Sequence, residues 1–429
     1  MYKVDVENED LFNEKTYKVK LKSGLNLYVC YKKGFHKKIG MFGTKYGSLT
    51  NEFIDIKTGE KQVVPDGIAH FLEHKLFEKE GQNALDMFSK IGVDSNAYTS
   101  YDQTVFYFQT VDKFEESIKM LVKLIKEPYF TDENVEKEKG IIEQEIKMGL
   151  DDPNYILYYN TINQMYLNSN VKIDIAGSVE SIQKINKELL YKCYDNFYNL
   201  NNMFFIVVGD VDVDKTIKLV DESINSYKND ISSKVVEKIS KKEPDIINEK
   251  EKVSKMDIGI SKLCIGFKLP PITGSKNLKR KVIVDFIYNL YFSEISDFFK
   301  NEYKKGIITS TIDLEYEGNS EFSHILLFAE SDKIEILKDN IINEIKMIKD
   351  INIDEKLFDL VKKDEFGTSI IDSDAMSPSY SRIIDSAIEN TNVYEALSLV
   401  KELKIEDIKE FMKYFDFEKM VISYVLSKE

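Results

Sequence analysis

The chain has 429 residues, of which 43% are hydrophobic and 31% are charged, and it contains no tryptophan. This length allows two or more domains, and the 25 tyrosines and 26 phenylalanines can fill sizeable cores. The net charge of −15 argues against a general nucleic-acid-binding protein, which needs a cationic face, and gives no support for docking on anionic membranes.

The cysteine content and the N-terminal sequence indicate the cellular compartment. The three cysteines lie far apart without a CxxC spacing, so neither a disulfide framework nor a thiolate zinc site is expected. The first 20 residues lack the apolar core of a signal peptide, and no run of about 18 apolar residues is present to span a bilayer. These features predict a soluble cytoplasmic protein that binds neither nucleic acid nor membrane.

The first part of the chain has the patterns of both strands and helices. In "TYKVKLKSGLNLYVCYKK" apolar and polar residues alternate on both sides of Ser23-Gly24, which predicts a β-hairpin. Pro65 and Gly67 then interrupt the chain, and Asp66 between them is a predicted N-cap for the helix that follows. Further along, the pattern predicts strands in residues 95–111 and 201–212 and helices in residues 112–127 and 133–150.

A charged segment with little apolar content, residues 234–253, is a predicted linker and contains Pro244. Beyond it the pattern of the first part returns. "INKELLYKCYDNFYNLNNMFFIVV" resembles "LKIEDIKEFMKYFDFEKMVISYV" at a constant shift of 218 residues, and "VDKFEESIKMLVKLIKE" resembles "SDKIEILKDNIINEIKMIKD" at a similar offset. Two unrelated amphipathic helices would share periodicity alone, so the matching offsets favour an internal duplication.

The duplication predicts an α+β fold of two homologous halves, residues 1–233 and 254–429. Each half is expected to be a sheet with helices packed on it. The second half has no histidine near position 288, where a shift of 218 residues would place a copy of His70, or in the adjoining "LYFSEISDF", so the two halves are expected to differ in function.

Two of the four histidines, His70 and His74, lie four residues apart and flank Glu73 in "GIAHFLEHKLF". On a helix, residues i and i+4 share a face, so both imidazoles can bind one zinc ion. Glu73 is then placed to act as general base toward a zinc-activated water molecule, in the inverted zincin order His-x-x-Glu-His. A surface pair of histidines around a glutamate is the alternative.

A third ligand need not be local, and the predicted helix "ENVEKEKGIIEQEIKMG" offers five glutamates. Glu138 and Glu145 are two turns apart and share one face, whereas Glu136 and Glu143 share another. Taken alone, this helix is typical of a solvated acidic surface. Periodicity cannot choose among these glutamates.

The motifs "DGIAHFLEHKLFEKEG", "SNAYTSYDQTVFYF" and "VEKEKGIIEQEI" resemble, in order and spacing, the catalytic half of the pitrilysin/insulinase family of zinc metallopeptidases. This family includes the β-subunit of the mitochondrial processing peptidase, and the likeness is greatest to its bacterial YmfH-type members. The resemblance covers most of the chain and implies two homologous halves with mostly antiparallel sheets. It implies one Zn²⁺ per chain, bound by His70, His74 and Glu145, with Glu73 as catalytic base and Glu138 supporting the site.

The resemblance also implies how substrate is held. An extended peptide is expected to add to a sheet edge, with Asn96 and Ala97 nearest the zinc ion. Many family members carry an Arg and a Tyr, seven residues apart, that help to bind the substrate carbonyl. Aligned on Gly306, these positions hold Glu302 and Thr309 here, and neither can do the same work.

The sequence therefore predicts a zinc-dependent endopeptidase that cleaves peptides or unfolded segments in an enclosed chamber. The alternative is a peptide-binding or partner-dependent subunit of a heterodimeric peptidase with little activity alone, as the missing Arg/Tyr pair suggests. The expected partners are a peptide or unfolded polypeptide substrate and either a second copy of the chain or a paralogous family member.

Overall fold

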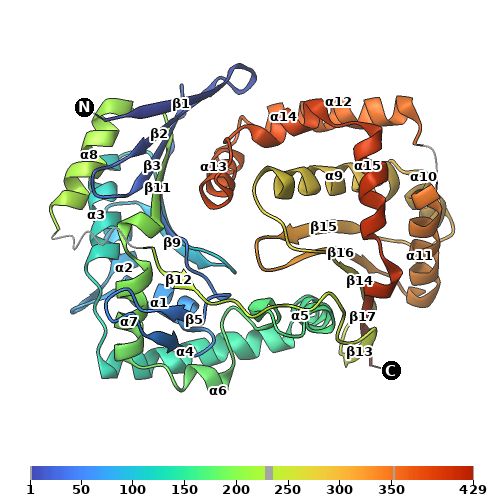
Figure 1. The fold of residues 1–429 in the computed structure, drawn as a ribbon, viewed down its shortest axis with the longest axis horizontal. Helices are drawn as coiled ribbons and strands as arrows, with labels where there is room; N and C mark the ends of the chain where they lie inside the picture. Colours follow the sequence, from blue (N-terminus) through green and yellow to red (C-terminus); the bar gives the residue numbers. More distant parts are fainter. Residues whose placement is uncertain (1, 228–234, 351–352, 429) are drawn as a thin grey trace. The chain divides into compact units, whose positions relative to one another are not determined.

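The computed structural model describes residues 2–227, 235–350 and 353–428 and divides into two compact units (Figure 1). None of the described helices has the length and the apolar character needed to cross a membrane. The first unit comprises Met1–Ile146, Ile173–Ser240 and Asp372–Tyr394, and the second comprises Lys147–Lys172, Lys241–Ile371 and Glu395–Glu429.

Counted over the described residues, the first unit contains a seven-stranded sheet in the order β1-β2-β3-β11-β4-β10-β9. Its strands are β1 (Val4–Glu9), β2 (Glu14–Lys20), β3 (Asn26–Lys32), β4 (Lys38–Thr44), β9 (Asp94–Thr99), β10 (Thr104–Thr110) and β11 (Met203–Gly209). Short strands β5 (Glu52–Ile54), β6 (Lys61–Val63) and β12 (Glu237–Lys238) form a second sheet, and β7 (Glu78–Lys79) pairs with β8 (Gln82–Asn83).

Helices pack on both faces of the large sheet. The described helices of this unit are α1 (Ile68–Phe77), α2 (Ala84–Lys90), α3 (Phe114–Lys126), α4 (Asp132–Asp151), α6 (Val179–Ile182), α7 (Lys187–Phe197), α8 (Val213–Asn225) and α13 (Ser377–Glu389). The centre of the sheet is β11, whose seven residues are all buried, with β3 parallel on one side and β4 antiparallel on the other. An apolar strand that is covered on both faces has no polar side to alternate with.

The predicted hairpin of β2 and β3 is confirmed, with antiparallel pairing from Glu14↔Lys32 to Lys20↔Asn26. Gly24 adopts a φ of +92° in its turn, a conformation that a residue with a Cβ atom rarely takes. Alternation along β2 gives the sheet two different faces. Val19 lies on one face and belongs to the main apolar core. Thr16 lies on the other face, where its hydroxyl is hydrogen-bonded to the hydroxyl of Tyr394.

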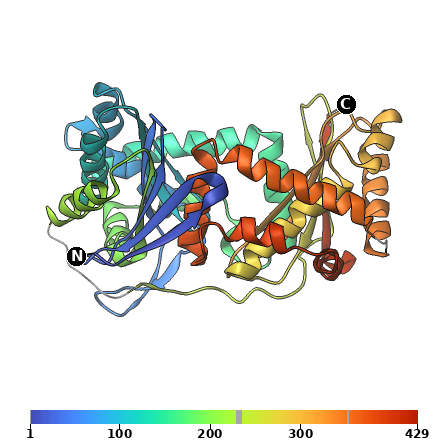
Figure 2. The same cartoon turned by 90° about the horizontal axis from the view of Figure 1, so that it is seen from above.

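That opposite face is covered by α13, which lies against β11 (Figures 1 and 2). A buried polar cluster fastens the helix there. The Glu14 carboxylate accepts hydrogen bonds from Lys32 Nζ at 2.6 Å, from Ser379 Oγ at 2.8 Å and from Arg382 at 3.0 Å. Lys32 Nζ also donates to the carbonyl of Ala375 at 3.2 Å. The helix is therefore held to the sheet by paired charges as well as by apolar contact.

We expect Lys32→Met to lower the free energy of unfolding by about 3–5 kcal/mol, because it removes a cation from a buried ion pair and leaves Glu14 undercompensated. The Lys32 and Glu14 side chains are 2% and 1% exposed, so water cannot replace the lost partner. Urea denaturation measures the change. Lys218→Met is the matched control: its ion pair with Glu222 is exposed, and the loss should stay below about 1 kcal/mol. Equal effects of the two substitutions would contradict this account.

In the second unit, the described residues form a five-stranded sheet in the order β13-β17-β14-β16-β15. The strands are β13 (Glu251–Met256), β14 (Lys262–Lys268), β15 (Asp313–Gly318), β16 (Ser323–Glu330) and β17 (Met420–Ser427). The helices are α5 (Pro153–Met165), α9 (Ser275–Tyr291), α10 (Asp297–Lys304), α11 (Ile334–Asp350), α12 (Glu355–Asp372), α14 (Glu395–Glu402) and α15 (Ile405–Phe411).

The two sheets share one topology. The order β3-β11-β4-β10-β9 matches β13-β17-β14-β16-β15, with the first pair parallel and the following pairs antiparallel in both. Helices α3 and α11, which contain one of the two sequence matches, occupy equivalent positions in the two units. Each follows the hairpin at the end of its sheet, β9-β10 or β15-β16. The predicted α+β fold of two homologous, mostly antiparallel halves is therefore confirmed.

Two helices do not belong to the compact unit that their position in the sequence would suggest. Helix α5 comes from the first part of the chain but packs on β13, β14 and β17, and α13 comes from the last part but packs on β11. The division at residues 1–233 and 254–429 stays a proposal. Within the predicted linker, residue 234 lies outside the described residues, Glu237–Lys238 pairs with β5, and Glu251 already begins β13.

Candidate metal centre

The helix that carries both histidines begins at Ile68, directly after Gly67. The prediction that Asp66 caps it is wrong. Gly67 precedes the helix with a φ of +85° and no side-chain cap, and Asp66 instead accepts a hydrogen bond from Asn51 at 2.7 Å. A Cβ atom on Gly67 would lie 2.3 Å from the carbonyl oxygen of Ala176, so this close backbone contact sets the start of α1.

Helix α4 presents one of its acidic faces to α1. Val135, Glu138, Ile142 and Ile146 are buried along it, a spacing of three to four residues that marks one side of a helix. Glu145, one position before Ile146, lies at the margin of this buried face, and its side chain is partly exposed to solvent. Contact with α1 therefore selects between the two faces that periodicity left open.

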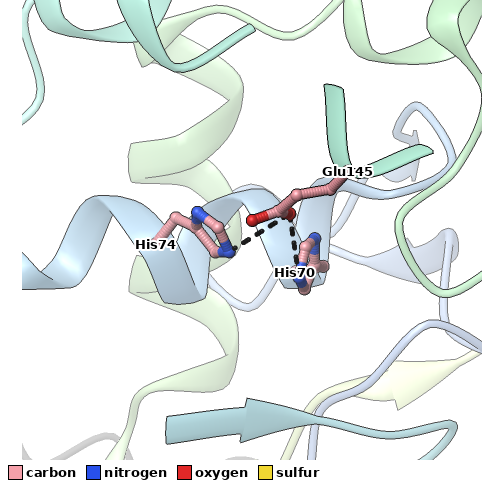
Figure 3. A group of neighbouring side chains, drawn as sticks. All are labelled: His70, His74 and Glu145. Carbon is pink, nitrogen blue, oxygen red and sulfur yellow. Dashed lines mark ion pairs between the residues drawn. The ribbon is translucent and has the colours of Figure 1, made fainter. Parts of the chain in front are cut away.

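His70, His74 and Glu145 come together at one point (Figure 3). One ligand atom from each lies within 4.8 Å of the others. Glu145 Oε2 is 4.0 Å from His70 Nε2 and 3.7 Å from His74 Nε2. Two imidazole nitrogens and a carboxylate are a donor set that fits Zn²⁺ and leaves a further position open, as catalytic zinc sites require.

The environment shifts the pKa values of the two imidazoles in opposite directions. Burial lowers the pKa of His70 to about 3, so its ring is neutral and has a lone pair to offer. Burial also acts to lower the pKa of His74, but its hydrogen bond to Glu138 and the nearby carboxylates outweigh burial and raise that pKa. His70 Nδ1 is buried without a hydrogen-bond partner among the described residues.

Glu138 lies behind His74, on the side away from Glu145. Its Oε1 is 3.0 Å from His74 Nδ1, and because a carboxylate only accepts hydrogen bonds, Nδ1 carries the proton. His74 Nε2 is then the atom with the free lone pair, and it faces Glu145. A carboxylate that orients a histidine in this way is usual behind zinc ligands.

Glu73 projects from α1 toward strand β9 rather than toward Glu138. Its side chain is 7% exposed, and its Oε2 accepts a hydrogen bond from Thr99 Oγ1 at 2.7 Å. Burial raises the pKa of this carboxyl, and the Thr99 hydrogen bond acts in the opposite direction. Sequence reasoning missed Thr99, although strand alternation puts it on the same face as Ala97.

Asn96 and Ala97 lie on β9, which is an edge strand of the seven-stranded sheet and packs against α1. The hairpin closes where Ser100 N–H donates to the carbonyl of Gln103, and alternation from there turns the backbone groups of Ala97 outward. The Ala97 N–H donates to Asn96 Oδ1 at 2.8 Å. A peptide that adds to this edge would have to displace the Asn96 side chain.

Glu302 and Thr309 belong to the second unit. Glu302 is buried at the end of α10, where it accepts hydrogen bonds from Asn340 at 2.6 Å and from Lys305 at 2.7 Å. These contacts give Glu302 a structural role inside the unit. Thr309 is exposed in the segment between α10 and β15.

Comparison with known proteins identifies relatives of this chain by sequence and by fold. Residues 52–178 match the family model of insulinase (peptidase family M16), and residues 184–364 match the model of the peptidase M16 inactive domain. The uncharacterized zinc protease YmfH of Bacillus subtilis (strain 168) is 34% identical over 95% of both chains. The β-subunit of the mitochondrial processing peptidase of Caenorhabditis elegans is 25% identical over 42% of this chain and 41% of its own length.

Solved structures show the same fold. An M16-like peptidase from Alicyclobacillus acidocaldarius has a TM-score of 0.92 at 27% identity and covers 97% of this chain and 99% of its own. Pitrilysin, at 16% identity and a TM-score of 0.76, matches 99% of this chain over 46% of its own length. Because both the sequence identity and the fold extend over nearly the whole length, the chain belongs to the insulinase family of peptidases, peptidase family M16.

Proposed function

We propose that this protein is a zinc-dependent endopeptidase that cleaves peptides or unfolded segments of polypeptide, with one zinc ion per chain. The observation that carries the proposal is the convergence of His70, His74 and Glu145, with Glu73 on the same helix as the two histidines. The names of the relatives support zinc protease chemistry in general.

The residues divide the chemistry among them. A bound zinc ion supplies Lewis acidity, which polarises a peptide carbonyl and acidifies a water molecule. Glu73 takes the proton of the attacking water and delivers it to the leaving amine, so the peptide bond is replaced by a carboxylate and an amine. The raised pKa of Glu73 brings its proton affinity closer to that of a base working near neutral pH.

Strand β9 holds the substrate in this proposal. A peptide strand gains main-chain hydrogen bonds along an open edge, and the outward groups of Ala97 are suited to provide them. Thr99 on the same strand bonds directly to Glu73, so the strand that binds the peptide also orients the base. Asn96 and Ala97 are thus the proposed substrate-binding residues.

Metal removal should abolish cleavage, and zinc should restore it. We expect the chelator-treated chain to leave unstructured peptides intact and to regain activity with Zn²⁺ but not with Mg²⁺, because imidazole donors favour zinc and Mg²⁺ prefers oxygen ligands. Mass spectrometry of a peptide library digested by the purified full chain measures this. Cleavage by the verified metal-free protein would contradict the proposal.

A second candidate function is a partner-dependent subunit of a heterodimeric peptidase. The observation that favours it is Glu302, whose buried carboxylate accepts a hydrogen bond from Asn340. The family resemblance implies an arginine at this position in many members. Cleavage only by a mixture with a co-purified paralogue would support this function. Cleavage by the purified chain alone would exclude it.

A further inference from the structure

Lys75 directly follows the metal-ligand candidate His74 on α1 and is completely enclosed by protein, with 0% of its surface exposed. Lysine is almost never fully buried unless its charge is paired, because transfer of an ammonium group out of water is costly. Its Nζ atom bonds to the carboxylate of Glu78, to the carbonyl of Asn134 at 3.0 Å and to Glu138 Oε2 at 3.3 Å. The chemistry proposed above gives this cation no task.

The contact with Glu138 connects Lys75 to the metal centre. The two oxygens of this carboxylate have different partners: Oε1 is 3.0 Å from His74 Nδ1, and Oε2 is 3.3 Å from Lys75 Nζ. The chain of contacts therefore runs from the ammonium through one carboxylate to the imidazole. Glu138 itself is buried, so solvent cannot easily replace either partner.

We propose that Lys75 is a positioning residue of the metal centre, which holds Glu138 against His74 and so fixes that imidazole with Nε2 toward Glu145. The inference rests on the proposed metal site and adds Lys75 as a residue that acts on the ligand His74 through Glu138. Without the ammonium, the carboxylate loses the partner on its second oxygen and is free to turn away from His74. The imidazole then loses the contact that sets its ring orientation.

The backbone contact of Lys75 strengthens this role. Asn134 lies one turn before Glu138 on α4, so a single ammonium group ties the helix of the two histidines to the helix of Glu145. The contact with Asn134 thus keeps the ammonium group beside Glu138, the carboxylate through which Lys75 acts on the orientation of His74.

Zinc affinity of the full chain, measured by competition with a chromophoric chelator, tests the proposal without reference to peptidase activity. We expect Lys75→Met to weaken zinc binding about tenfold or more, within the 10- to 100-fold range typical of residues behind a ligand. The absorption spectrum of bound Co²⁺ should change as well, because it reports ligand geometry. Lys75→Arg, which keeps the charge, should restore much of the affinity.

Two matched controls separate this role from general stabilisation. Lys79 is also a buried lysine, 8% exposed, but its Nζ bonds to the carbonyls of Leu124 and Glu127 at 2.7 and 2.6 Å. Lys79→Met should lower stability and leave zinc affinity unchanged. Glu78→Gln removes the negative charge of a Lys75 partner that does not touch His74, and it should also leave zinc affinity unchanged. Loss of zinc affinity in the Lys79 variant equal to that of Lys75→Met would overturn the proposal.

A double-mutant cycle with Glu138→Gln tests the path of the effect. If Lys75 acts through Glu138, the double variant should bind zinc no more weakly than Glu138→Gln alone, whereas additive losses would overturn the proposal. If Lys75→Met does not fold, Lys75→Gln, which keeps a donor for Asn134, takes its place in the cycle. Wild-type affinity in folded Lys75→Met or Lys75→Gln, beside lost binding in His70→Ala, refutes the positioning role alone. Zinc bound without any peptide cleavage refutes only the peptidase proposal.

Discussion

Glu73→Gln should bind zinc as the wild type does and cleave peptides about 100- to 10,000-fold more slowly, the usual loss when a general base is removed. Glutamine keeps the size of the side chain and can still accept the hydrogen bond from Thr99, so the local packing is preserved. It cannot take a proton from water. Metal content by elemental analysis and kcat with a quenched fluorescent peptide together measure the outcome.

The matched control for that substitution is Glu136→Gln on α4, whose side chain is exposed and paired with Lys139. It removes the same charge from the same unit without touching α1, and it should leave kcat unchanged. A Glu73→Gln enzyme with wild-type kcat would remove Glu73 from the catalytic role.

Glu145→Gln should lower zinc affinity by more than about 100-fold, because loss of a direct ligand exceeds the cost of losing a residue behind one. Glu143→Gln, two residues earlier on the same helix, should leave affinity unchanged. The pair tests the choice of helix face directly, since both substitutions remove one negative charge from α4. Chelator competition measures both affinities.

The opposite result, with Glu143 required and Glu145 dispensable, would mean that the proposed third ligand is wrong. Loss of zinc from both variants in equal measure would point to the total charge of α4 rather than to a ligand. The distances of 3.7 and 4.0 Å from Glu145 Oε2 to the two imidazoles lead us to expect neither result.

Local patterning was sufficient to predict much of the fold. The β2-β3 hairpin follows from alternation around one glycine, and the Asp132–Asp151 helix follows from its composition and length. The pairing of His70 with His74 needs only the helical repeat. The sequence therefore reveals contacts that are close along the chain, where the geometry of one element decides them.

Contacts between different helices and strands were harder to predict from the sequence. Five glutamates on one helix look alike until a neighbouring helix covers one face, and only a family resemblance singled out Glu145. The N-cap prediction for Asp66 failed because a backbone approach at Ala176, distant in sequence, requires Gly67 at that point. Lys75 has the chemistry of a surface residue, and its burial depends on carbonyl and carboxylate groups from α4.

The positions of α13 and α5 also escaped prediction, because an amphipathic helix does not specify which sheet it will cover. Their placement has a consequence for biosynthesis. Strand β11, the last of the first sheet, ends at Gly209, whereas α13 begins only at Ser377. While the ribosome makes the residues between them, Glu14 and Lys32 lack the partners that α13 and the residues before it supply. The first unit can therefore complete its fold only after most of the chain has been translated, and neither half can be expected to mature as an isolated fragment.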